Sequence, residues 1–122
     1  MPIIDIEFVC ESGAGPGTVT AHALADALGK ALGSRPGQTW VRLHFLASSA
    51  YAENGVTVGA SELPTFVTIL HAHPPAGTAL VAEVDAITDA VAKCVSRPPE
   101  RVHVQYASPG AGRQAFGGRI VE

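Results

Sequence analysis

Residues 2–9 read Pro-Ile-Ile-Asp-Ile-Glu-Phe-Val, and residues 64–71 read Pro-Thr-Phe-Val-Thr-Ile-Leu-His. Both stretches begin with proline and are rich in β-branched and aromatic residues, as is typical of β-strands. The second begins 62 residues after the first, just as Ser96-Arg97-Pro98 follows Ser34-Arg35-Pro36 by 62 residues. This shared register predicts that the chain contains one structural unit twice.

Each of these strands is followed by a helical pattern and then by a second strand. Apolar residues recur at helical spacing in residues 18–32 and again from Leu80 to Val95. Thr18 is the expected N-cap of the first helix, and Gly33 is the expected residue after its last turn. Residues 40–46 and 102–106 then read as the closing strands of the two units.

Two strand–helix–strand units predict parallel pairing within each unit, through right-handed crossovers. We therefore expect an α/β (α+β) fold, with one four-stranded sheet and both helices on one face. A single domain would span residues 1–122, with repeat halves at about 2–55 and 64–118. The sheet face without helices would then need cover, and oligomerisation is the simplest way to provide it.

The composition limits the classes of function. Of the 122 residues, 47% are hydrophobic and 16% are charged, and the formal net charge is −3. The sequence has no basic patch for nucleic acid, and no apolar stretch approaches the roughly 20 residues that span a bilayer. Its start lacks the features of a signal peptide, and its two cysteines do not make a disulfide scaffold. We therefore expect a cytoplasmic protein that binds neither nucleic acid nor membrane.

The two β-α-β halves, the proline directly after Met1, and the segments Arg35-Pro-Gly-Gln-Thr-Trp, 64–73 and Pro99-Glu-Arg-Val-His together resemble the tautomerase superfamily. The second half resembles a 4-oxalocrotonate tautomerase subunit. The whole chain is similar in layout to macrophage migration inhibitory factor and 5-carboxymethyl-2-hydroxymuconate isomerase. The resemblance implies a homotrimer with three equivalent pockets at subunit boundaries, and a chemistry that needs no cofactor.

In that family the initiator methionine is removed, and the free amine of the proline moves a proton between carbon and oxygen. The resemblance therefore implies that Pro2 is the general base and acid of a keto–enol tautomerase or isomerase. Its substrate would be a small 2-oxo acid or enol carboxylate. A terminal secondary amine suits this role because burial or nearby cations lower its pKa towards neutrality. The role requires removal of Met1, since an amide nitrogen is not a base.

The resemblance also implies which residues hold the substrate. Arg42 matches an arginine that binds the substrate in 4-oxalocrotonate tautomerase, and a guanidinium suits two-point capture of a carboxylate. The alternative for Arg42 is a solvated side chain or an interface ion pair. Arg35 matches a pocket-side lysine, or else it is a cation favoured at a helix C-terminus. His103 stands where the family has a tyrosine and would polarise the substrate oxygen. The alternative is a structural histidine whose hydrogen bonds are satisfied within its strand.

Three further residues are candidates for substrate binding by the same resemblance. His73 matches a position that lines the pocket, although Pro75 replaces a family lysine just beyond it. Arg113 and Phe116 lie in the Gly-rich tail that closes the pocket in the family, and Phe116 matches an apolar wall residue. The alternative for both is a hairpin at a subunit interface.

Other readings of the sequence remain open. His71 and His73 form a His-x-His pair, which would become a metal site with His103 or Cys10 as third ligand. No further ligand lies at a supporting spacing, so we expect no metal. Related proteins also use the proline for decarboxylation or hydration, which need an acidic residue such as Glu53 or Glu122. A binding or signalling protein with a vestigial pocket, and a structural trimer without ligand, are the non-enzymatic alternatives.

Overall fold

The computed structural model describes residues 2–11 and 17–122. Its main sheet has four strands in the order β2-β1-β3-β4. They are β1 (Ile3–Cys10), β2 (Trp40–Ala47), β3 (Thr65–Leu70) and β4 (Val102–Tyr106). Strand β2 runs parallel to β1 and β4 runs parallel to β3, while the antiparallel pairing of β1 with β3 joins the two halves.

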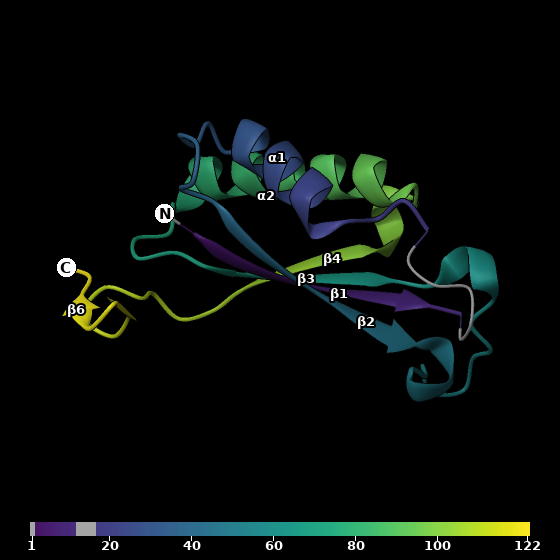
Figure 1. The fold of residues 1–122 in the computed structure, drawn as a ribbon. Helices are drawn as coiled ribbons and strands as arrows, with labels where there is room; N and C mark the ends of the chain where they lie inside the picture. Colours follow the sequence, from purple (N-terminus) through teal and green to yellow (C-terminus); the bar gives the residue numbers. More distant parts are fainter. Residues whose placement is uncertain (1, 12–16) are drawn as a thin grey trace.

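Helices α1 (Ala21–Ala31) and α2 (Gly77–Val95) both lie on one face of this sheet (Figure 1). The fold class and the tandem β-α-β arrangement expected from the sequence are therefore confirmed. None of the helices in the described part of the chain is long and apolar enough to cross a membrane.

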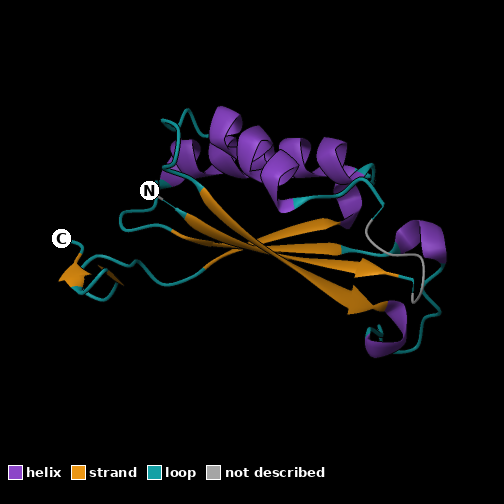
Figure 2. Cartoon of the chain, viewed as in Figure 1, coloured by secondary structure: helices purple, strands orange, loops and turns teal. Residues whose placement is uncertain are grey.

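Short elements occupy the two ends of the sheet (Figure 2). Three 3₁₀ turns are η1 (Ser48–Ala50), η2 (Ala60–Glu62) and η3 (Pro99–Arg101). The C-terminal tail forms a hairpin of β5 (Ala115–Phe116) and β6 (Arg119–Ile120). This hairpin lies at the same end of the molecule as the N-terminus (Figure 1).

The first helix begins later than the sequence pattern predicts. The Thr20 hydroxyl accepts a hydrogen bond from the Ala23 amide at 3.1 Å, so Thr20 is the N-cap and the expectation of Thr18 is wrong. Val19 is buried, and the chain therefore enters the core before the helix starts. Gly33 follows the last turn with φ +64°, as expected of a glycine in the left-handed conformation.

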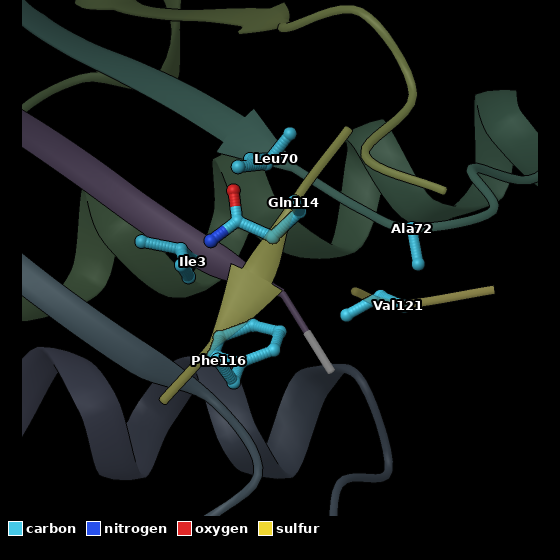
Figure 3. Close-up of a pocket in the computed structure, with 6 residues that line it drawn as sticks. All are labelled: Ile3, Leu70, Ala72, Gln114, Phe116 and Val121. Carbon is cyan, nitrogen blue, oxygen red and sulfur yellow. The ribbon is translucent and has the colours of Figure 1, made fainter. Parts of the chain in front are cut away.

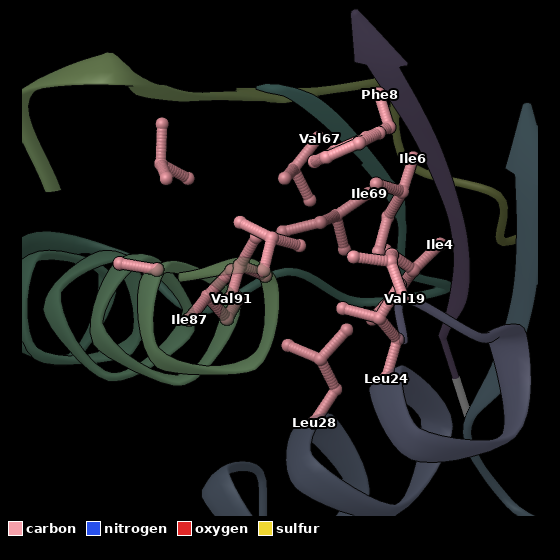
Figure 4. Packing of buried hydrophobic residues seen from close by; sticks show 13 residues of the cluster. Ile4, Ile6, Phe8, Val19, Leu24, Leu28, Val67, Ile69, Ile87 and Val91 are labelled. Carbon is pink, nitrogen blue, oxygen red and sulfur yellow. The ribbon is translucent and has the colours of Figure 1, made fainter. Parts of the chain in front are cut away.

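The hydrophobic core lies between the helices and the sheet (Figure 4). Alternate residues of β1 and β3 point towards the helices because successive side chains of a strand face opposite sides. Fully buried side chains of this core include members of β1 (Ile4, Ile6), α1 (Leu24, Leu28), β3 (Val67, Ile69) and α2 (Ile87, Val91). This packing fixes which strand residues are left on the helix-free face.

The helix-free face is polar at its centre. The strand register places Asp5 beside Arg42, Glu7 beside His44, and Thr68 beside Gln105. A second subunit that covers this central region would therefore meet polar and charged side chains. Large apolar side chains are exposed instead at the edge strand β2, where Trp40 is 44% exposed and Phe45 is 47% exposed.

Arg97 ties the end of α2 to the sheet. Its guanidinium donates to the carbonyls of Pro64 and Val9 and to the Thr65 hydroxyl. The guanidinium carbon lies 3.7 Å from the centre of the Phe8 ring. These contacts hold β1, β3 and α2 together at the end of the sheet opposite the N-terminus.

Candidate active site

Pro2 lies immediately before β1 and is buried. Its carbonyl accepts a hydrogen bond from the Trp40 amide at 3.1 Å, which extends the pairing of β1 with β2 by one position. The C-terminal tail is attached to the same end of the sheet, because the Gly110 amide donates to the His71 carbonyl at 2.8 Å. The start of the chain and the tail are therefore brought together although they are far apart in the sequence.

An apolar cavity of about 130 Å³ lies at this end of the sheet. Its walls come from β1 (Ile3), from the end of β3 (Leu70, Ala72) and from the tail (Gln114, Phe116, Val121) (Figure 3). The volume is equivalent to about four water molecules in the liquid. The Gln114 amide is the polar side chain among these residues, so the cavity suits a small group with a largely apolar surface.

Phe116 closes one side of this region. Its ring packs edge-to-face against Trp40, with 5.2 Å between the ring centres and 86° between the planes. Phe116 is therefore an apolar wall residue of this cavity. The sequence assigned Trp40 no role in the site, and its indole also donates to the Gly37 carbonyl at 2.9 Å.

Arg42 lies on the helix-free face, next to Asp5. Its Nε and one terminal nitrogen donate to the two carboxylate oxygens of Asp5 at 2.6 Å and 2.7 Å. This two-point hydrogen bond and the charge of Asp5 raise the pKa of Arg42. The guanidinium fork expected to bind a substrate carboxylate therefore already holds a carboxylate of its own chain.

Arg35 has a different environment. It lies exposed in the loop that joins α1 to β2, five residues before Trp40. The structure gives its side chain no hydrogen bond or ion pair to another described residue. Arg113 is likewise exposed, on the turn between Gly110 and β5. His73 is exposed as well, and its Nε2 lies 2.9 Å from the carbonyl oxygen of Glu122, at the end of the tail. Neither Arg113 nor His73 lines the cavity.

His103 lies at the other end of the sheet. It pairs with Phe66, which pairs with Glu7, four residues along β1 from Ile3. At about 3.3 Å per residue, this separation is roughly 13 Å along the strand. A single chain therefore does not place His103 beside Pro2.

A polar cluster surrounds His103. Glu53 accepts hydrogen bonds from the Tyr51 hydroxyl and from Arg101, both at 2.6 Å. These two bonds, with smaller contributions from the charges of Arg101 and His103, lower the pKa of Glu53. The Phe66 ring lies between Tyr51 and His103, with centre distances of 5.8 Å and 5.6 Å. The sequence identified Glu53 as a possible acid but did not predict its hydrogen bonds with Tyr51 and Arg101.

The His-x-His pair does not converge on one point. Strand β3 ends at Leu70, so the two histidines are not held on one face of a strand. His71 instead contacts Glu83 on α2 at 3.0 Å, whereas His73 contacts the end of the tail. Among the described residues, no group of three His, Cys, Asp or Glu side chains is arranged to hold a metal ion.

The protein has the tautomerase fold, and the resemblance expected from the sequence is confirmed at the level of the fold. The chain is similar to a fused 4-OT solved as a symmetric trimer, with a TM-score of 0.74 and 14% identity over 98% of this chain and 94% of that one. It is similar to macrophage migration inhibitory factor from Oncomelania hupensis, with a TM-score of 0.69 and 17% identity over 100% and 83% of the two chains.

Malonate semialdehyde decarboxylase is a further similar structure, with a TM-score of 0.64 and 15% identity over 94% of this chain and 90% of that one. No protein-family model and no curated protein sequence matches the chain. Identities this low establish the fold alone, and the activity has to be argued from the residues of this chain.

Proposed function

We propose that this protein is a keto–enol tautomerase or isomerase that acts on a small 2-oxo acid or enol carboxylate. The proposal is carried by the buried position of Pro2 at the sheet end that holds the apolar cavity. Once Met1 is removed, Pro2 ends the chain in a secondary amine. Poor solvation disfavours the protonated form of such an amine and lowers its pKa, which suits a base that works near neutral pH.

In the proposed reaction, the Pro2 amine takes a proton from the carbon next to the substrate carbonyl. The ammonium that results returns this proton to oxygen or carbon, so that the amine is regenerated. Negative charge develops on the substrate oxygen during the transfer, and a hydrogen-bond donor aimed at that oxygen lowers the barrier. His103 is our candidate for this donor.

Because His103 lies about 13 Å along the sheet from the start of its own β1, the donor has to come from a second subunit. We therefore propose a homotrimer with a pocket at each subunit boundary. The exposed Trp40 and Phe45 of the edge strand support an interface there. The similar fused 4-OT was solved as a trimer.

For the substrate carboxylate we propose Arg35 in preference to Arg42. Arg42 is neutralised by its two-point hydrogen bond with Asp5. No described residue is such a partner for Arg35, and its loop leads into Trp40, which packs on Phe116 at the rim of the candidate site. A charge-assisted hydrogen bond from an unengaged guanidinium is the stronger attraction for an incoming carboxylate.

Ultraviolet-monitored tautomerisation of phenylpyruvate and 2-hydroxymuconate tests this proposal, with loss of Met1 confirmed by intact mass. We expect turnover that Pro2→Ala abolishes. Pro98→Ala, a change at an exposed proline, serves as the matched control and should retain full activity. Equal turnover in Pro2→Ala and the unaltered protein would contradict the role of the amine. No turnover of either compound after Met1 removal would favour the second candidate below.

That second candidate is decarboxylation or hydration of a small acid. It is favoured by Glu53, whose lowered pKa keeps it ionised and able to orient a water molecule near His103. The alkynyl oxo acid 2-oxo-3-pentynoate separates the two proposals, because a nucleophilic amine adds to its triple bond whereas a hydratase adds water. A covalent adduct on Pro2 without released hydration product supports the tautomerase, and released hydration product supports the hydratase. A hydratase should also lose this activity in Glu53→Gln.

A further inference from the structure

A cluster of three ionisable side chains lies under α2, at the end of the sheet that carries Pro2. The Tyr106 hydroxyl donates to Oε2 of Glu83 at 2.5 Å, and His71 Nε2 lies 3.0 Å from the same oxygen. The rings of His71 and Tyr106 are stacked, with 6.1 Å between their centres and 15° between their planes. One carboxylate oxygen is therefore shared by two ring side chains.

The cluster is largely removed from solvent. The side chains of His71 and Glu83 are 14% and 15% exposed. Tyr106 packs against the hydrophobic core, and its pKa is raised by burial first and then by its hydrogen bond to Glu83. At neutral pH the phenol is therefore a hydrogen-bond donor. His71 donates as well when its Nε2 carries the proton.

The register of the sheet brings this cluster to Pro2. The last printed pair of β1 and β3 is Ile3 with Leu70. Pro2 precedes Ile3 and His71 follows Leu70, so each lies one residue beyond the last pair of this ladder. The His71 side chain contacts Glu83 of α2, so it lies on the helix side of the sheet, and Pro2 is buried at the same end.

We propose that His71, Glu83 and Tyr106 are positioning residues that place a carboxylate charge next to the Pro2 amine and stabilise its protonated form during the reaction. This inference rests on the proposed function of Pro2. When the amine takes a proton from the substrate it gains a positive charge, which a nearby carboxylate stabilises. Glu83 takes up no proton itself, and the proton returns from Pro2 to the product.

A purely structural role does not call for a charge at this position. A buried ionised group is costly, and apolar side chains of similar size often stabilise a protein equally well. Tyr106 from β4, Glu83 from α2 and His71 from the end of β3 are the ionisable groups that meet here. The tail contributes the Gly110 amide, which donates to the His71 carbonyl. Within the described residues, no other ionisable side chain is hydrogen bonded to the cluster.

The test measures the pKa of the Pro2 amine by NMR, from the ¹⁵N shift of labelled proline in protein that has lost Met1. We expect Glu83→Gln to lower this pKa by about 0.5–1 unit, because the variant keeps a hydrogen-bonding group but removes the charge that favours the protonated amine. Asp85→Asn, an exposed change on the same helix, is the matched control and should leave the pKa unchanged. Glu83→Met repeats the charge removal with an apolar side chain of similar length, should the glutamine variant fail to fold.

An amine pKa that is the same in Glu83→Gln, Glu83→Met and the Asp85→Asn control would overturn the inference and leave the cluster a structural contact. The NMR measurement needs no turnover, so it separates the two proposals. If phenylpyruvate and 2-hydroxymuconate are not converted, the proposed function fails. The NMR measurement still decides whether Glu83 raises the pKa of the Pro2 amine. If they are converted, the acidic limb of kcat/KM should move with the amine pKa in the Glu83 variants.

Discussion

Asp5 holds the guanidinium of Arg42 by two hydrogen bonds, of 2.6 Å and 2.7 Å, between adjacent parallel strands. The two residues are 37 positions apart in the sequence, and the parallel register of β1 and β2 places them side by side. Arg42, which the sequence analysis identified as a candidate for binding substrate, thus forms an ion pair within its own chain.

This ion pair leads to a prediction about substrate binding. We expect Arg35→Gln to raise KM for a 2-oxo acid by about 10-fold or more, because hydrogen bonds between charged groups contribute roughly 1.5–3 kcal/mol. Arg42→Gln should change KM less than about threefold, because Arg42 is already engaged by Asp5. Steady-state kinetics on both variants decides between them. A larger rise in KM for Arg42→Gln would mean that substrate displaces Asp5 and that our assignment is reversed.

Arg97 gives a prediction about stability. Replacing Arg97 with Met removes three hydrogen-bond donations and leaves the carbonyls of Pro64 and Val9 without this partner. We expect the free energy of unfolding in urea to fall by about 2–4 kcal/mol, because the Val9 carbonyl loses this donor and the Pro64 carbonyl keeps only the Val9 amide, at 3.2 Å. Arg119→Met, at an exposed position of the hairpin, is the control and should change stability by less than about 0.5 kcal/mol. Equal stability of the two variants would show that the Arg97 contacts contribute nothing.

Tyr106 gives a prediction about alkaline pH. Burial and Glu83 raise its pKa in the folded protein above that in the unfolded chain. Its contribution to stability is therefore fully present below about pH 10, the unfolded value, and is lost as the pH rises above it. We expect the free energy of unfolding to fall more steeply above pH 10 in the unaltered protein than in Tyr106→Phe. Parallel curves for the two proteins, measured by denaturant unfolding at each pH, would contradict the shift.

Phe45 gives a prediction about assembly. It is 47% exposed on the edge strand, and Val81 is 63% exposed on the outer side of α2. If the edge strand lies in a subunit interface, Phe45→Lys should shift sedimentation from trimer towards the 12.5 kDa monomer at micromolar concentration. Val81→Lys introduces the same charge away from that strand and should leave the trimer intact. A monomeric unaltered protein would exclude the proposed assembly altogether.

The sequence predicted much of the fold because the fold is local and repeated. The β-branched runs after Pro2 and from Pro64 onwards, and the apolar stripes at helical spacing, specify strands and helices through side-chain burial alone. Their repetition gave the order of elements and the parallel pairing within each half. The boundaries could be predicted less closely, since Thr18 and Thr20 are equally good caps by residue type and the structure shows that Thr20 accepts the Ala23 amide.

The repeat could not predict what its corresponding residues do. Arg35 and Arg97 occupy the same position in the two halves, yet Arg35 is exposed while Arg97 is bonded to the ends of β1 and β3. The difference depends on what packs against each helix end. That is a property of the assembled sheet, in which each half has different neighbours.

The sequence by itself determined the elements and their order, because these depend on residue type and on short-range periodicity. The candidate base at Pro2 came from the resemblance to the tautomerase superfamily. Only the tertiary structure decided that Arg42 is held by Asp5, that His71 and Tyr106 share Glu83, and that His103 is remote from Pro2. Each of these facts depends on strand register or on the packing of a helix against a sheet. Such contacts join residues that are distant along the chain, and no local pattern encodes them.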